Sequence, residues 1–210
     1  MKIKLNNSLK SYTTIFFVGI LVGCICRLLD YFPAEGLWGF SSIQTLLGFW
    51  IITNTVVVLM SSSNICAGVS SFLYMFGMTL SFYGLQAILG MFIPLFSGGF
   101  RKRLFIMFTI ASIPCAIAAF ILYFWNKDNR FNSVLYGLPV GALLAETIGT
   151  IIWFTQNHPE KYLFQIIMDL IGAIIFGVLF WKRAKSKTIY TFSIGITALI
   201  FYFTQYHHSL

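Results

Sequence analysis

Charged side chains are scarce in this sequence. Only 10% of its 210 residues are Asp, Glu, Lys or Arg, and Asp and Glu together number six. A soluble domain is nearer 25% charged, so the composition excludes an ordinary water-soluble fold. Apolar runs of about 20 residues recur along the whole chain and leave no room for a separate soluble domain. We therefore expect one polytopic transmembrane domain over residues 1–210.

Cysteine and histidine are also few, with four and three residues respectively. The cysteines have no metal-site spacing and lie in or beside apolar runs, where cysteine is usually a small packing residue. The histidines stand in one turn and at the C-terminal tail. We predict no metal site, no cofactor and no disulfide framework. The cysteines are Cys24, Cys26, Cys66 and Cys115.

Known catalytic motifs are absent. The chain contains no His-Glu-x-x-His, no Gly-x-Ser-x-Gly and no phosphate-binding loop. Its last apolar run has no lysine that could form the Schiff base of a retinal protein. The sequence therefore does not predict an enzyme, and an intramembrane hydrolase ranks third among the functions considered.

Seven apolar runs predict an all-α integral membrane protein, a bundle of seven transmembrane helices. One alternative concerns the first run, where Leu21-Val22-Gly23-Cys24 resembles a bacterial lipoprotein cleavage box. Cleavage there would leave six spans. Against cleavage, the apolar run continues past Cys24, and Gly19-x-x-x-Gly23 is typical of a helix-packing face. The predicted spans are 12–30, 43–60, 67–93, 104–125, 134–156, 162–181 and 188–206.

The basic residues set the expected topology. Their excess gives a net charge of +8, and they cluster at the ends of apolar runs, which suits acidic lipid headgroups rather than nucleic acid. Loops on the N-terminal side of the membrane carry nine of them and the opposite side carries five, including Arg101, Lys102 and Arg103. By the positive-inside rule we expect a bacterial cell-membrane protein with a cytoplasmic N-terminus and an outside C-terminus.

Small residues recur on two predicted helices, where they would allow close helix packing. A shift of 118 residues also aligns part of the first three spans with the last three, which suggests a 3+1+3 repeat. This organisation resembles sugar transporters of the SWEET type, although the chain lacks their Pro-Gln dipeptide. The small residues are Ser70, Gly77, Ser81 and Gly84 in the third span, and Gly137, Gly141, Ala145 and Gly149 in the fifth.

Two acids, Glu146 and Asp169, stand alone in apolar sequence. They lie twelve residues before and eleven residues after His158, in the turn between the fifth and sixth spans. In an antiparallel hairpin this spacing puts both carboxyls at one depth, roughly 10–12 Å below the outer surface. A charge near the bilayer centre costs about 2.5–3.5 kcal/mol, so two acids at one depth indicate a structural or functional role. We predict that both face each other or a shared cavity inside the bundle.

Three more polar residues are expected in the same outer half. Arg27 falls in the outer third of the first span, Gln44 opens the second, and Gln86 lies in the outer part of the third. Together with Glu146 and Asp169 they form the predicted substrate- or ion-binding set, in which Arg27 balances part of the acids' charge. The alternative is a structural charge cluster that locks the first, fifth and sixth spans together.

These observations favour a small transporter or permease component with an acidic site in the outer half of the bundle. Its expected partners are the lipid bilayer and a small polar solute or cation. The second hypothesis is a non-catalytic accessory subunit that packs against a membrane protein partner or another copy of itself. Neither hypothesis involves nucleic acid.

Overall fold

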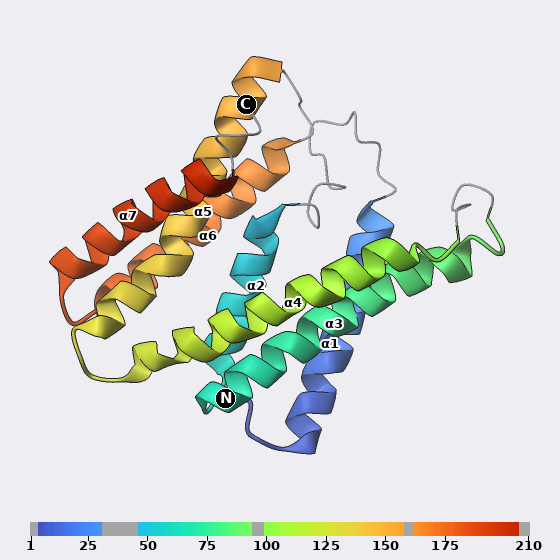
Figure 1. The fold of residues 1–210 in the computed structure, drawn as a ribbon, viewed down its shortest axis with the longest axis horizontal. Helices are drawn as coiled ribbons and strands as arrows, with labels where there is room; N and C mark the ends of the chain where they lie inside the picture. Colours follow the sequence, from blue (N-terminus) through green and yellow to red (C-terminus); the bar gives the residue numbers. More distant parts are fainter. Residues whose placement is uncertain (1–3, 31–45, 94–98, 158–161, 206–210) are drawn as a thin grey trace. The chain divides into compact units, whose positions relative to one another are not determined.

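The structure is a computed structural model that describes residues 4–30, 46–93, 99–157 and 162–205. Within these ranges it is all-helical, and the one β pairing is an isolated bridge between Leu5 and Ser61. The apolar runs form the helices, as the sequence predicted. Figure 1 shows them in chain order: α1 Leu9–Leu29, α2 Leu47–Met60, α3 Asn64–Leu89, α4 Lys102–Leu122 with the short 3-10 helix η3 Tyr123–Asn126, α5 Phe131–Asn157, α6 Leu163–Arg183 and α7 Lys187–Gln205.

Six of the described helices are long and apolar enough to cross a membrane. This architecture is consistent with a multi-pass membrane protein. The exception is α2, whose 14 residues span about 21 Å, short of a hydrocarbon core of about 30 Å. The first residues of the predicted second span, 43–45, lie outside the described ranges. The count of seven spans therefore stays a prediction.

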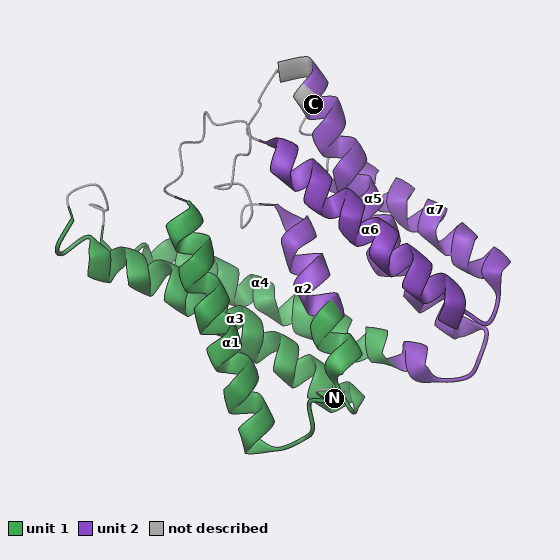
Figure 2. Ribbon diagram, turned by 180° about the vertical axis from the view of Figure 1, so that it is seen from behind, with its two compact units in different colours: residues 1–31, 56–123 green, residues 32–55, 124–210 purple. Residues whose placement is uncertain are grey.

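The chain divides into two compact units (Figure 2). Unit 1 comprises residues 1–31 and 56–123, and unit 2 comprises residues 32–55 and 124–210. The division falls inside α2, whose N-terminal part belongs to unit 2 and whose C-terminal part belongs to unit 1. The single transmembrane domain expected from the sequence stays a prediction.

Unit 1 is built around α3, which packs against α1 on one side and α4 on another. Glycines bring α1 close to α3: a Cβ added at Gly19 would lie 2.2 Å from the backbone oxygen of Tyr74, and one at Gly23 would lie 2.2 Å from that of Met78. The packing face predicted from Gly19-x-x-x-Gly23 is confirmed. The stripe predicted on α3 holds in part, because Gly77 meets α1 while Gly84 has no described atom within 4 Å of its Cβ position.

Serine side chains cap the beginnings of α1 and α3 in unit 1. The Ser11 N–H donates to Ser8 Oγ (3.3 Å) at the beginning of α1, and the Cys66 N–H donates to Ser63 Oγ (3.1 Å) at the beginning of α3. These bonds satisfy backbone donors that the first helical turn leaves free. From its cap α1 runs without a break through Cys24, and all four cysteines are free thiols.

Unit 2 is built around α5, which packs against both α6 and α7. Glycines again allow the close approach: a Cβ at Gly137 would lie 2.5 Å from Ser193 Oγ, and one at Gly141 would lie 2.7 Å from the backbone oxygen of Ile194. Ser193 Oγ donates a hydrogen bond to the backbone oxygen of Val134 across the same seam (2.7 Å). The predicted small-residue seam on α5 therefore packs against α7.

A buried aromatic cluster fills the end of unit 2 near the α6–α7 turn. The rings of Trp125, Tyr136 and Phe180 have centroids 4.8–5.3 Å apart, and Phe176 stacks on Phe180 at 5.6 Å. Such contacts add to the burial of large apolar surface. The cluster holds the N-terminal end of α5 against the C-terminal end of α6. Asp169 lies near the other end of α6.

Candidate functional site

Glu146 on α5 and Asp169 on α6 are both fully buried inside unit 2, with 0% of each side chain exposed. The two helices pack against each other, and the carboxyls lie close enough for the charge of Glu146 to act on Asp169. The expectation that the acids face each other or a shared cavity stays a prediction. Two carboxyls in one apolar environment are costly unless they share a proton, a cation or polar partners.

Gln165 is the described hydrogen-bond partner of Asp169. Its Nε2 donates to Asp169 Oδ2 over 2.8 Å, and both side chains are fully buried. The two residues are one turn apart on α6, where side chains four positions apart lie on the same face. The amide thus supplies one donor to one carboxyl oxygen, and it holds that carboxyl in a fixed orientation.

The other carboxyl oxygen of Asp169 lies against the first turn of α2. A Cβ added at Gly48 would be 1.9 Å from Asp169 Oδ1, so only glycine leaves room for the carboxyl there. Within the described residues, Oδ1 is buried and has no hydrogen-bond partner. The first turn of a helix carries the positive end of its dipole, which favours a negative group beside it.

Apolar side chains pack near the acids. A Cβ at Gly172, one turn beyond Asp169 on α6, would lie 2.8 Å from Ile52 Cδ1 and 3.4 Å from Leu143 Cδ1. Leu143 itself lies one turn before Glu146 on α5 and is fully buried. Burial beside these apolar side chains lowers the local dielectric, so a cation or proton bound to the carboxyls would be held strongly.

The donor set suits a proton or a small cation better than a transition metal. Among the described residues, no group of three or more His, Cys, Asp or Glu could hold a metal ion. Two carboxyls and an amide oxygen are oxygen ligands of the kind that hard cations prefer. Gln165 offers such an oxygen, because its Oε1 is buried and lacks a hydrogen-bond partner among the described residues.

The other predicted site residues fall in unit 1 or outside the described ranges. Arg27 forms an ion pair with Asp30, with Nη1 and Oδ2 2.6 Å apart, and its guanidinium lies 4.9 Å from the ring centroid of Phe82. Gln86, one turn after Phe82 on α3, is buried, and its Oε1 has no described hydrogen-bond partner. Gln44 lies outside the described residues. The proposed balance of Arg27 against the two acids of unit 2 thus stays a prediction.

Sequence reasoning missed two residues of the acid site. Gln165 could have been found, because an amide four positions before an isolated acid on a helix is a recognisable pair. Gly48 carried no such signal: its importance comes from the approach of α2 to α6, which is a tertiary contact. The amides chosen from the sequence, Gln44 and Gln86, were selected by predicted depth alone.

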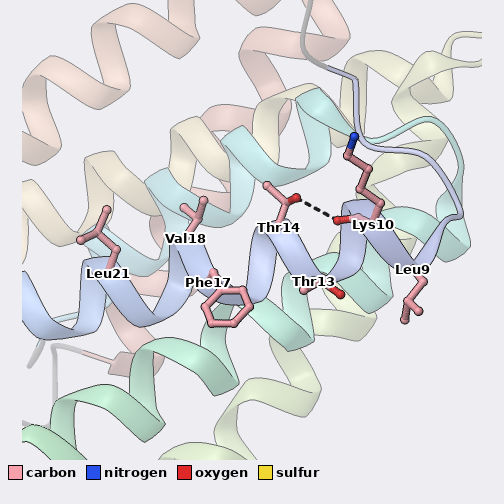
Figure 3. A pocket seen from close by; sticks show the side chains of 7 residues that line it. All are labelled: Leu9, Lys10, Thr13, Thr14, Phe17, Val18 and Leu21. Atoms are coloured by element: carbon pink, nitrogen blue, oxygen red, sulfur yellow. Dashed lines mark hydrogen bonds between the residues drawn. The ribbon is translucent and has the colours of Figure 1, made fainter.

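Two surface grooves are described, and neither contains the acids. One lies on α1 in unit 1 and has a volume of about 680 Å³; Figure 3 shows the seven side chains that line it, among them Lys10, Thr14 and Phe17. The other, of about 530 Å³, lies along α7 in unit 2. Glu146, Gln165 and Asp169 are themselves fully buried within unit 2. No known family model, curated protein or solved structure matches this chain.

Proposed function

We propose that the chain is a small transporter or permease component of a bacterial cell membrane, and that Glu146 and Asp169 bind its proton or small cation. The observation that carries the proposal is the full burial of two interacting acids in an apolar unit. Ionisable residues inside membrane helices are rare and commonly mark ion pathways. Gln165 positions Asp169 and supplies a further oxygen.

Binding would work by charge balance. Two ionised carboxylates side by side in a low dielectric repel each other strongly, and removing them from water adds a further cost. One proton shared between Glu146 and Asp169 removes half of that charge, and a bound cation offsets it. Release of the ion would leave an unstable charge pair, so occupancy can drive a change in helix packing.

The 3+1+3 repeat supports transport, because many transporters are built from such repeats. The shift of 118 residues places Gly19 on Gly137 and Gly23 on Gly141. In unit 1 the glycines of α1 meet α3, and in unit 2 the glycines of α5 meet α7. The first helix of each triplet thus packs on the third through corresponding glycines. We include the repeat, the outer-half position of the acids and the cytoplasmic N-terminus in the proposal.

An accessory membrane subunit is the second candidate. It is favoured by α4 and α7, whose side chains are mostly exposed although both helices are apolar. Lipid covers such faces in a transporter, whereas a protein partner would cover them in an accessory subunit. An accessory subunit should co-purify with that partner from native membrane and should move no ion alone.

Flux through purified protein in liposomes tests the proposal. Vesicles loaded with a pH-sensitive dye receive a potassium diffusion potential, and parallel vesicles receive radioactive sodium. The wild-type protein should carry protons or sodium, and Glu146→Gln and Asp169→Asn should remove the flux while leaving a folded protein. Asp128→Asn is the control, because Asp128 is exposed and pairs with Lys185 at 2.9 Å outside the acid site. Wild-type vesicles that carry neither ion would contradict the proposal.

A further inference from the structure

The groove on α7 is lined by polar and basic side chains at one end and by apolar side chains at the other. Its lining begins with Trp181 of α6 and Lys187 and Thr191 of α7, and it continues with Phe192, Gly195 and Leu199. Gly195 is exposed, and no described atom lies within 4 Å of its Cβ position. The missing side chain therefore deepens the groove at its apolar part.

The length of the groove matches one leaflet of a bilayer. Lys187 and Leu199 are twelve residues apart, which corresponds to about 18 Å of helix. Half of a hydrocarbon core measures about 15 Å. An acyl chain lying along the apolar part would thus place its headgroup beside Lys187 and Trp181.

One basic residue, Lys187, lines the headgroup end of the groove, and three more lie close to it in the sequence. Lys182, Arg183, Lys185 and Lys187 fall within six consecutive residues. Lys185 is ion-paired with Asp128, whereas Lys187 lines the groove. The Lys187 ammonium donates to the backbone oxygens of Trp181 and Ala184, and lies 5.4 Å from the ring centroid of Trp181. An ammonium has three donors, so one remains to meet a phosphate oxygen.

We infer that this groove is a binding site for one acidic phospholipid. The acyl chain lies over Phe192, Gly195 and Leu199, and the phosphate lies at Lys187. The neighbouring basic residues add positive charge near this end of the groove. Half-exposed Trp181 sits at the headgroup level, where tryptophan is enriched in membrane proteins. Charge complementarity selects the occupant, because nearby Lys and Arg side chains attract an acidic headgroup.

The α1 groove of Figure 3 provides an internal comparison. It has a similar order of residues, with Lys10 first and Phe17 and Leu21 further along. Each groove is lined by one basic residue, Lys10 or Lys187, so the grooves differ in the tryptophan that lines the α7 groove and in the further basic residues close to Lys187 in the sequence. We expect this groove to hold lipid without selecting the headgroup. The assignment of the acidic lipid to α7 is independent of the acid site and of transport.

Native mass spectrometry of delipidated protein tests the site. The protein in detergent is mixed with dioleoyl phosphatidylglycerol or with dioleoyl phosphatidylcholine, and the bound lipids are counted. One phosphatidylglycerol should be retained in preference to phosphatidylcholine. Lys187→Gln should weaken phosphatidylglycerol binding about fivefold and leave phosphatidylcholine binding unchanged. Equal retention of the two lipids by the wild-type protein would overturn the inference.

Filling the groove gives a second test. Gly195→Leu should abolish phosphatidylglycerol retention, whereas Gly84→Leu should not, although both glycines have no described atom within 4 Å of the Cβ position. If Gly195→Leu does not elute as a single species, Leu199→Ser replaces it, and the same loss is expected. Unchanged retention in the folded α7 variant, or loss only when Val18→Trp fills the α1 groove, would refute the assignment.

Discussion

Asp169 Oδ1 lies directly against the backbone of Gly48, since a Cβ at that glycine would be 1.9 Å from the oxygen. This contact joins the acid site to the first turn of α2. One methyl group added at Gly48 would therefore disturb the site, because a packed interior has no free space for it.

Gly48→Ala should destabilise the protein by about 1–3 kcal/mol, the usual cost of overpacking. Helix propensity alone would make a glycine-to-alanine change stabilising. A loss of stability would therefore come from the clash with Asp169. Thermal unfolding in detergent measures it. Gly84→Ala is the matched control and should be neutral or stabilising, since no described atom lies near its Cβ position. Equal effects of the two substitutions would exclude a specific contact at Gly48.

Gln165→Leu should cost about 1–3 kcal/mol of unfolding free energy, because it removes a described hydrogen bond of a buried carboxyl. Asp169→Leu in the same background should recover much of the loss, since an apolar pair leaves no unsatisfied group. A double-mutant cycle from denaturant or thermal unfolding gives the coupling energy. A coupling energy of zero would show that the amide does not support Asp169.

Gly141→Ala should weaken the seam between α5 and α7. The added Cβ would lie 2.7 Å from the backbone oxygen of Ile194, and a backbone atom cannot move aside as a side-chain tip can. We expect a loss of about 1–3 kcal/mol, measured as a lower Tm. Gly177→Ala serves as control, because its Cβ would meet Val140 Cγ1 at an ordinary 3.9 Å. If both variants melt alike, the seam is not tightly packed.

Arg27→Met should destabilise unit 1 by about 1–3 kcal/mol, because it leaves Asp30 without its ion-pair partner. The figure is below that of a fully buried pair, since the Asp30 side chain is 31% exposed and water compensates in part. Arg103→Met, at an exposed position, should change the unfolding free energy little. The same melting temperature for both variants would mean that the pair adds no stability.

The expected orientation can be tested by cysteine labelling. After replacement of the four native cysteines by alanine, Lys185→Cys should be protected from an impermeant reagent added outside intact cells, and Asn157→Cys should react. The reason is the nine-to-five distribution of basic residues between the two sides. The opposite labelling pattern would reverse the topology.

Helix positions could largely be predicted from the sequence because hydrophobic length is a strong signal in a membrane protein. The sixth span was expected at 162–181 and α6 is Leu163–Arg183; the seventh was expected at 188–206 and α7 is Lys187–Gln205. The second span was expected at 43–60, and its described helix begins at Leu47. Apolar and aromatic residues precede that start, so composition alone does not mark the boundary.

The acid site could be predicted only in part. Glu146 and Asp169 could be identified because each is the only acid in a long apolar run. Charged residues are rare in such runs because burying them is costly. The neighbours of the acids depend on which helices pack together, and hydrophobic runs do not encode that order. For this reason Gly48 was missed, while Arg27, chosen for its depth, has its described ion pair with Asp30.

The position of one acid on each of α5 and α6 has a consequence for biosynthesis. Inserted alone, each helix would expose its carboxyl to lipid at a cost of about 2.5–3.5 kcal/mol. Only five residues separate the end of α5 from the start of α6, so α6 follows α5 closely as the chain is made. The two acids can then enter the bilayer together, already shielded by the packing of α5 on α6 and by the bond from Gln165. We therefore expect α5 to stay at the insertion machinery until α6 has emerged, so that the hairpin is the unit that partitions into lipid.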